Sequence, residues 1–509
     1  MKHTTAFART GLSALRLPAT LLLSAVLALG STLPAGAQNS DVEDLKTQLK
    51  AMQKMMEEMQ KKIDQLEKEK TAQPPPAPPT TPPPAPPQAP AAAGPSALEK
   101  ASPSVQTLER IAEGQDVGHT SPIAPRNNLN DQQEGAPRPG DLTLDPKYRG
   151  FIPVPNTPAL IKFNAKPRVD MTSDTKDSGN PDRFVTAQIP VKGQSDFGGT
   201  EQFNVNARGS QLSFDLRAPE MEGNLRFYYQ NDFFGSGSGM VYRLRQLYGQ
   251  FFNLTAGFTY SCFEDPDAWP DTVDYEGPNS AIFARRALAR YMVPFAGGWQ
   301  WNVGVEAPSA EIDGSGTPNG VSSQNAAPDG TMNFRWENAK VGHVQLAGVL
   351  RDLGARGDGV GNQSVLGWGL NLAGSINVLE RDSVQGQLTY GDGIFRYIND
   401  DFVNNDAAYN SSGNLQAIPC FGGMVGYTHH WSDKFRTTGS FGYVHLDNTT
   451  PQGPDAYRKT YYGSMNLVWQ ARKKLSVGLE GLYGRKEVQS GAFGDVWRVQ
   501  IGLIYSLFD

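Results

Sequence analysis

After its first residues, the sequence lacks any apolar run long enough to form a membrane-spanning helix. A helix needs about 20 apolar residues to cross a bilayer, and no segment after residue 37 comes near that length. The mean hydropathy is −0.45. A helical membrane protein is therefore excluded. A soluble exported protein and a membrane β-barrel, whose apolar residues alternate with polar ones, both fit this profile.

Cysteine is almost absent, with Cys262 and Cys420 as the two examples. Both lie near predicted loop ends, and an oxidising compartment would permit a disulfide between them. The geometry that a disulfide needs cannot be read from spacing, so pairing and two free thiols are both left open.

Histidine is also scarce, with six residues in the chain. His429 and His430 are adjacent, so on a strand they would point to opposite faces and could not share a metal ion. No CxxC, Walker or GxSxG motif stands in a suitable context. We therefore predict a protein that is not an enzyme, with no cofactor and no bound metal. The net charge of −6 argues against a nucleic-acid partner.

Residues 1–37 are typical of a secretory signal peptide. Basic residues precede an apolar run at 17–29, and the small residues at 35–37 (AGA) form the cleavage pattern. The apolar run is too short to span about 30 Å of hydrocarbon. We predict that the mature chain starts near Gln38.

Residues 38–70 carry a heptad pattern. Apolar residues recur at alternating spacings of three and four, which indicates a coiled coil of about four heptads. A single amphipathic surface helix is the alternative, but the neighbouring segments offer no core for it to pack on. The seam consists of Val42, Leu45, Leu49, Met52, Met56, Met59, Ile63 and Leu66.

Residues 71–145 predict a linker without regular structure. The part from 71 to 95 is rich in proline and alanine, which favours an extended polyproline spacer. The part from 96 to 145 is polar, with many Pro, Asn, Gln and Gly residues.

From residue 146 to residue 509, short segments alternate apolar and polar residues. The last of these segments places Trp497, Val499 and Ile501 at every second position. A period of two predicts β-strands with one apolar and one polar face. The fold class is therefore all-β.

The connections between these segments alternate in length. Seven short turns lie near 219–224, 253, 295–298, 338–342, 380–383, 431–434 and 471–474. Longer polar connections centre near 185, 236, 270, 318, 358, 405, 452 and 490. Outer-membrane barrels have short periplasmic turns and longer outer loops. We predict a transmembrane antiparallel β-barrel of about sixteen strands, with both ends on the short-turn side.

Aromatic residues lie near many predicted strand ends, as in the interfacial girdles of outer-membrane barrels. Ordinary core packing is the alternative role. These residues are Phe252, Trp299, Trp301, Trp431, Trp469, Trp497 and Tyr505.

Basic residues occupy the strand positions that alternate with the apolar stripe. An arginine in lipid would cost about 2–4 kcal/mol at the midplane, so we place these residues on the barrel interior. There they would favour anions, or would pair with the acids Asp170, Asp215, Asp232 and Glu480. They are Lys162, Lys166, Arg168, Arg226, Arg243, Arg245, Arg286, Arg290, Arg335, Arg351 and Arg436.

The connection between the predicted fifth and sixth strands is unusually acidic. It could fold inward and narrow the pore, so that its carboxylates oppose the wall arginines in a transverse field. A solvated surface loop and a Ca²⁺ site are the alternatives, although the spacing matches no calcium-loop motif. The acidic residues are Glu264, Asp265, Asp267, Asp271, Asp274 and Glu276.

Three stretches resemble the DcaP-like outer-membrane channels. They are FEDPDAWPDTVD at 263–274, RLRQLYG at 243–249 and GDGI followed by RYI at 391–398. The layout of heptads, linker and barrel is similar as well. The resemblance implies a trimeric, sixteen-stranded porin in the bacterial outer membrane. It further implies a periplasmic coiled coil and the passage of small anions such as dicarboxylates.

Two functions follow from these patterns. The first is a homotrimeric channel for passive diffusion of small, preferably anionic solutes. The second is a structural or adhesive envelope protein, in which the barrel is an anchor in the outer-membrane lipid. In that case the N-terminal region, which would lie in the periplasm, binds a periplasmic or cell-wall partner.

Overall fold

The computed structural model describes residues 151–154, 157, 159–218, 225–315, 321–357, 361–379, 381–401 and 405–507. The chain divides into two compact units, 1–93 and 94–509, and all described residues belong to the second. The predicted signal peptide, coiled-coil seam and linker therefore lie outside the described residues. In the part of the chain that is described, no helix is long and apolar enough to cross a membrane.

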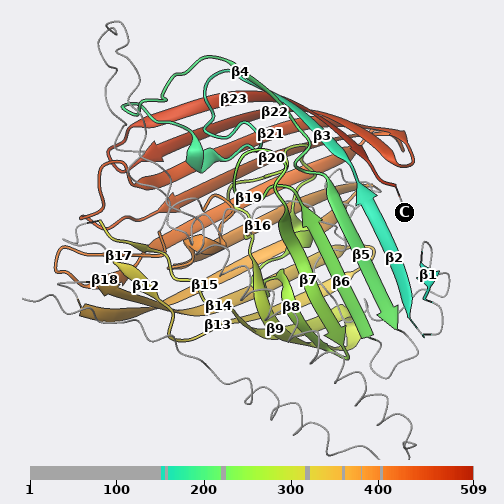
Figure 1. Cartoon of the computed structure of the whole chain (residues 1–509), viewed down its shortest axis with the longest axis horizontal. Helices are drawn as coiled ribbons and strands as arrows, with labels where there is room; N and C mark the ends of the chain where they lie inside the picture. Colours follow the sequence, from blue (N-terminus) through green and yellow to red (C-terminus); the bar gives the residue numbers. More distant parts are fainter. Residues whose placement is uncertain are drawn as a thin grey trace, which may run out of the picture. The chain divides into compact units, whose positions relative to one another are not determined.

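Nearly all the regular structure is β (Figure 1). The larger sheet has twenty strands. They are β1 (Ile152–Pro153), β2 (Leu160–Lys166), β3 (Arg168–Asp174), β4 (Gln202–Asn206), β5 (Gln211–Ala218), β6 (Leu225–Asp232), β7 (Arg243–Phe251), β8 (Leu254–Tyr260), β9 (Arg285–Pro294), β10 (Trp299–Glu306), β12 (Ser322–Gln324), β13 (Asp329–Asn338), β14 (Gly342–Gly357), β15 (Gly361–Val378), β16 (Asp382–Asp392), β19 (Pro419–His430), β20 (Phe435–Leu446), β21 (Tyr457–Arg472), β22 (Leu475–Val488) and β23 (Phe493–Tyr505).

A smaller sheet is built from the connections. It consists of β11 (Ile312–Asp313), β17 (Ala407–Tyr409) and β18 (Leu415–Ala417). Short 3-10 helices are η2 (Thr186–Gln188), η3 (Pro266–Ala268), η4 (Ala296–Gly298) and η5 (Phe395–Tyr397).

Successive long strands pair antiparallel along the larger sheet. β2 pairs with β5, and β3 pairs with β4. β2 and β3 are therefore two halves of one long strand that is interrupted at Pro167, and they lie beside β4 and β5, the two halves of a second interrupted strand. At the other end of the chain, β23 pairs with both β22 and β3. The last long strand is therefore a neighbour of the first, and the sheet curves round accordingly (Figure 1).

The two faces of the sheet have inverted polarity compared with a soluble protein. On β15, Leu370 is 52% exposed, whereas the adjacent Asn371 is fully buried. We call the face of Leu370 the outer face and the face of Asn371 the inner face. On the outer face Leu346 and Leu388 lie opposite Leu372 on either side, so the apolar surface continues from strand to strand. Such a surface is rare on soluble proteins and expected next to lipid.

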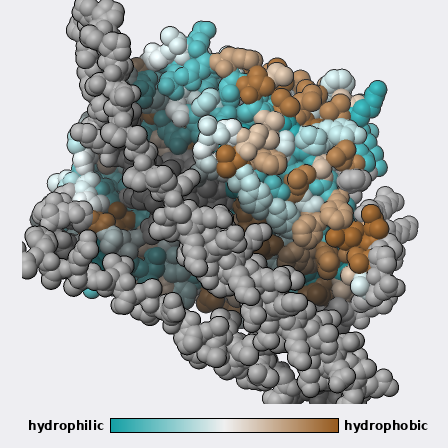
Figure 2. Space-filling view, in the orientation of Figure 1, coloured by the Kyte–Doolittle hydropathy of each residue, from teal (hydrophilic) through white to brown (hydrophobic). Residues whose placement is uncertain are grey.

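The aromatic residues predicted at the girdles lie on the outer surface. All seven are between 39% and 66% exposed, so the alternative of core packing is wrong for them. Their placement in two belts stays a prediction. Figure 2 shows brown hydrophobic residues exposed beside teal hydrophilic ones on the face in view.

The strand boundaries confirm the seven short turns. Two connections predicted to be longer, near 358 and 490, are instead tight. β14 ends at Gly357 and β15 begins at Gly361, and β22 ends at Val488 before β23 begins at Phe493. The polar residues there belong to long hairpins, because the β14–β15 ladder continues to its last pair, Gly357 with Gly361.

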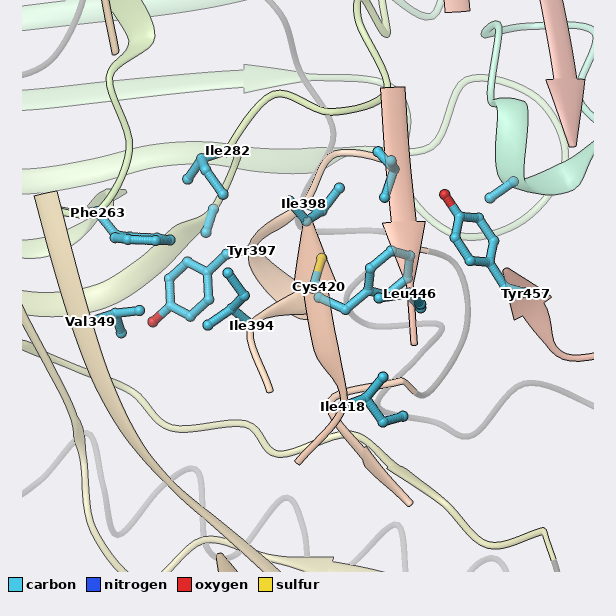
Figure 3. Close-up of a cluster of buried hydrophobic side chains, with 14 of the residues drawn as sticks. Phe263, Ile282, Val349, Ile394, Tyr397, Ile398, Ile418, Cys420, Leu446 and Tyr457 are labelled. Atoms are coloured by element: carbon cyan, nitrogen blue, oxygen red, sulfur yellow. The ribbon is translucent and has the colours of Figure 1, made fainter. Parts of the chain in front are cut away.

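The long connection between β8 and β9, residues 261–284, lies against the inner face and is buried along almost its whole length. It joins the segment around η5. Phe283 N donates to Tyr397 O (2.8 Å), and Asn399 N donates to Ala281 O (2.9 Å). Figure 3 shows Phe263 and Ile282 from the first segment beside Tyr397 from the second. The apolar core therefore lies inside the curved sheet, where the connections meet.

Both cysteines are buried and free. The disulfide that the sequence permitted is therefore not formed. Cys262 lies in the 261–284 connection, where its N–H donates to Glu306 (2.9 Å). Cys420 lies on β19 between Gly391 and Leu446. The strand ladder and the apolar cluster fix Cys420 separately from the loop that carries Cys262.

Candidate functional site

The basic residues singled out in the sequence come together on the inner face. Lys162 is partly buried and the others are no more than 4% exposed. They come from β2 (Lys162, Lys166), β3 (Arg168), β6 (Arg226), β7 (Arg243, Arg245), β9 (Arg286, Arg290), β13 (Arg335), β14 (Arg351) and β20 (Arg436).

The acidic residues of the 261–284 connection are also buried, each no more than 2% exposed. This excludes the solvated surface loop considered from the sequence. The structure fastens the 261–284 connection at three places, twice to the strands of the wall and once to a neighbouring connection and β6.

The first contact fixes the beginning of the connection at η3. Arg335 on β13 donates to Asp265 (2.9 Å) and to Asp267 (2.8 Å), and His343 Nε2 lies 2.9 Å from Asp265 Oδ2. Burial opposes the charged form of Asp265, but His343 and Arg335 outweigh it and hold the pKa of that carboxyl well below its usual range.

The same cluster is the place where a bound cation, considered from the sequence, could lie. Among the described residues, the ligand atoms of Asp265, Asp267 and His343 lie within 4.8 Å of one another, close enough to hold a metal ion. Arg335 donates to both carboxylates, so a fixed positive charge already stands where a cation would bind. The geometry therefore disfavours the Ca²⁺ alternative.

The second contact fixes the middle of the connection to the opposite side of the sheet. Arg436 Nε on β20 donates to Asp271 (2.6 Å), and Glu480 on β22 accepts from the backbone N–H of Asp274 (2.6 Å). Burial raises the pKa of Asp274, although Arg498 and nearby backbone N–H groups favour its charged form.

The third contact joins the end of the 261–284 connection to β6 and to the connection between β3 and β4, residues 175–201. Arg183 donates to Glu276 (3.0 Å), and the Tyr275 hydroxyl donates to Asp232 (2.8 Å). Burial raises the pKa of Glu276 to about 7 against the opposing effect of Arg183. Burial likewise raises the pKa of Glu264, at the start of the connection, well above its ordinary value.

Other wall arginines are neutralised by acids of the wall itself. Arg168 pairs with Asp170 (2.7 Å) and Arg226 with Asp215 (3.1 Å), while Arg243 pairs with Asp232. These three acids were identified in the sequence as candidate partners. Glu480, the fourth candidate, binds the backbone of the 261–284 connection instead of an arginine.

Arg351 on β14 has partners that the sequence did not indicate. It pairs with Asp329 (3.1 Å) and Asp406 (2.9 Å), and it lies 5.3 Å from the centroid of the Tyr397 ring. Tyr397 stands in the RYI motif at 396–398, and this motif was the one feature of the sequence that pointed to Tyr397 as a functional residue. Asp406 lies in an irregular connection, where spacing gave no indication of a contact with β14.

Arg286 and Arg290 on β9 differ from the rest. Among the described residues, neither forms an ion pair within 4.0 Å of a carboxylate, and the Nε atom of each has no hydrogen-bond partner. They are 4% and 3% exposed. A buried, uncompensated charge is costly, so an anion that reached the inner face would be stabilised here.

An apolar outer face around a polar, arginine-rich inner face is the arrangement of an outer-membrane channel. The chain belongs to the DcaP outer membrane protein family, whose model matches residues 115–507. It is therefore a bacterial outer-membrane protein of the porin type.

The chain is similar to several solved porins. The outer membrane channel DcaP of Acinetobacter baumannii is 17% identical over 70% of this chain and 99% of its own, with a TM-score of 0.62. An anion-selective porin from Comamonas acidovorans is 11% identical over 69% and 100%, with a TM-score of 0.44. OprB of Pseudomonas putida is 11% identical over 68% and 94%, with a TM-score of 0.42. No curated protein matches the sequence.

Proposed function

We propose that this protein is a porin through which small anionic solutes, dicarboxylates among them, diffuse passively down their gradient. The observation that carries the proposal is the pair Arg286 and Arg290. Both are buried on the inner face, and within the part of the chain that the structure describes neither pairs with a carboxylate. Positive charges that line a pore attract anions and oppose cations.

We infer that the larger sheet closes into a barrel. Support comes from β23, which pairs with β3 at one edge and with β22 at the other. The twenty strands become sixteen when β1 is left out and each of the pairs β2–β3, β4–β5 and β12–β13 is counted as one interrupted strand. Barrels of this size enclose an aqueous channel.

We propose that the 261–284 connection is the constriction of this channel. The sequence suggested that its carboxylates oppose the wall arginines across the pore in a transverse field. Their short contacts with Arg335, Arg436 and Arg183 favour a different role. The carboxylates hold the connection in place, and the arginines without carboxylate partners provide the field that a solute meets.

The N-terminal arrangement is proposed from the sequence alone. The signal peptide directs export, and the heptads at 38–70 join three chains into a homotrimer in the periplasm. The linker at 71–145 connects them to the short-turn side of the barrel. No energy source, cofactor or metal is needed, because the solute gradient drives transport.

The proposal is tested with the purified full-length protein in planar bilayers. Under a KCl gradient we expect a reversal potential that shows a preference for chloride over potassium, and liposomes should swell in a C4 dicarboxylate. A preference for potassium would contradict the anion proposal.

The structural or adhesive function gives a different result. It predicts no conductance, and it has one observation in its favour, since buried residues of several connections pack together inside the curved sheet. Deleting residues 38–145 separates the two functions. The channel should still conduct without them, whereas an anchor would lose its attachment to the periplasmic partner.

A further inference from the structure

Arg286 is held against an aromatic ring instead of a carboxylate. Its guanidinium carbon lies 4.5 Å from the centroid of the Tyr397 ring. Two carboxylates, Asp329 and Glu306, lie at the hydroxyl end of the same ring. Either of them could form a stronger bond with Arg286 than the ring does, because arginine–carboxylate pairs are charge-assisted and bidentate.

The Tyr397 hydroxyl has one proton, which it donates to Asp329 while also facing Glu306. It lies 2.9 Å from Asp329 Oδ2 and 3.4 Å from Glu306 Oε2. Burial raises the pKa of this phenol well above its ordinary value, and Asp329 raises it further. The hydroxyl therefore stays protonated and donates to Asp329.

The remaining acceptors on these carboxylates are largely engaged. Asp329 also accepts from Arg351 Nε (3.1 Å). Glu306 Oε1 accepts three hydrogen bonds, from Ser261 Oγ (2.8 Å), Cys262 N (2.9 Å) and Thr331 Oγ1 (2.8 Å).

The position of the ring is fixed from several sides. Phe263 meets it edge to face at 5.4 Å, with an interplanar angle of 84°. The Tyr397 carbonyl accepts from Phe283 N (2.8 Å), and Ile394 and Val349 lie beside the ring (Figure 3). Tyr397 therefore has little freedom to leave Arg286 or the two carboxylates.

We propose that Tyr397 is a positioning residue that keeps Arg286 available to a permeating carboxylate or halide anion. Its ring supports the guanidinium, and its hydroxyl occupies the carboxylates that would otherwise neutralise it. A cation–π contact is weaker than an arginine–carboxylate pair, so Arg286 keeps its attraction for an anion in the pore. This inference rests on the function proposed above.

The substitution Y397F tests the proposal without changing any charge. The ring remains, but Asp329 Oδ2 and Glu306 Oε2 lose the Tyr397 hydroxyl, which leaves room on these two oxygens for Arg286, while the other hydrogen bonds of the carboxylates are kept. We expect the chloride-to-potassium permeability ratio to fall about fivefold, the effect of one neutral hydrogen bond. The measurement is the reversal potential of the full-length porin in planar bilayers under a KCl gradient.

A matched control exists in the same connection as Tyr397, between β16 and β19. Tyr409 on β17 is 2% exposed, and its hydroxyl has no hydrogen-bond partner among the described residues. We expect Y409F to leave the permeability ratio at the wild-type value. A fall equal to that of Y397F would show that loss of any buried hydroxyl has this effect, and would overturn the proposal.

A double-mutant cycle tests the route through Arg286. R286Q should lower the permeability ratio more than Y397F does, and adding Y397F to R286Q should lower it no further. An additional fall in the double variant would overturn the positioning role. An anion-selective wild type with an unchanged Y397F would overturn this inference alone. A wild type without anion preference would overturn the proposed function, and this inference with it.

Discussion

The strands β13 and β9 both carry buried arginines on the inner face, but the guanidinium groups of the two strands have different partners. Arg335 on β13 contacts Asp265, Asp267 and Glu337, whereas Arg286 on β9 lies over the Tyr397 ring and forms no ion pair with a carboxylate among the described residues. The side chains are equally buried, at 1% and 4% exposure. Under the proposed function, an arginine on the inner face acts on selectivity only where no carboxylate reaches its guanidinium.

The largest expected effect comes from breaking the paired wall. R335L removes the arginine that pairs with the buried Asp265 and Asp267, which should cost about 3–5 kcal/mol of the free energy of unfolding. Thermal unfolding followed by circular dichroism and by the heat-dependent shift on a gel measures this loss. The control is R381A, which removes an exposed pair with Asp433 and should cost no more than about 1 kcal/mol. Equal unfolding temperatures for the two variants would contradict a fastening role for Arg335.

A somewhat smaller effect is expected from an arginine on the outer face. Leu370 is 52% exposed on β15, and L370R should cost about 2–4 kcal/mol if that face meets lipid. Leu379 lies outside the strands, between β15 and β16, and is 81% exposed. L379R is the control and should be close to neutral in the same refolding assay in lipid. A harmless L370R would contradict the lipid-facing assignment.

The stability of the fold should depend on pH, and the sign of this dependence should differ between the acids of the 261–284 connection. Burial raises the pKa of Glu276 from 4.5 to about 7. The folded state therefore binds the proton more tightly than the unfolded state. The stability from this group is fully present below pH 4.5 and is lost as the pH rises through about 7.

We expect the wild-type unfolding temperature to fall between pH 5 and pH 8, and E276Q to reduce that fall. Asp265 has the opposite sign, because its pKa is lowered. Its contribution is lost only at more acidic pH, outside this window. An identical pH profile for E276Q and the wild type would argue against a titrating Glu276.

On the unpaired wall, stability and selectivity should separate. R286Q removes a charge that has no carboxylate partner among the described residues, so the unfolding temperature should not fall. R335L should instead lower the unfolding temperature strongly. The same thermal assay compares the two variants, and an R286Q porin as unstable as R335L would remove the distinction between the walls.

The smallest effect is expected from the cysteines. Cys262 and Cys420 are free, and burial raises the pKa of the Cys262 thiol to about 11, which disfavours the reactive thiolate. A reducing agent should change neither the unfolding temperature nor the conductance. A lower unfolding temperature on reduction would instead indicate a disulfide.

Much of the fold could be predicted from the sequence because strand alternation and turn composition are local properties. The short turns near 253 and 338–342 stand where they were predicted. The connection near 358 was predicted to be too long, because a polar hairpin that extends beyond the apolar band has the composition of a loop. Its residues pair in the ladder of β14 and β15, which composition does not reveal.

For the candidate site, the sequence could predict which residues belong to it but not which of them contact one another. The basic residues and the acidic connection were identified by residue type and by position in the two-residue period. Their division into paired and unpaired groups was not. Asp265 and Arg335 are 70 residues apart in the chain and 2.9 Å apart in the structure, and no period or motif relates them.

The sequence by itself determined that the chain alternates apolar and polar residues in strands, with leucines on one face and arginines on the other. That follows because the side chains of a strand point alternately to its two faces. Only the tertiary structure decided which arginines meet a carboxylate and which, like Arg286, meet a ring. Ion pairing requires contact within about 4 Å, and that distance is set by how the connections fold against the inner face.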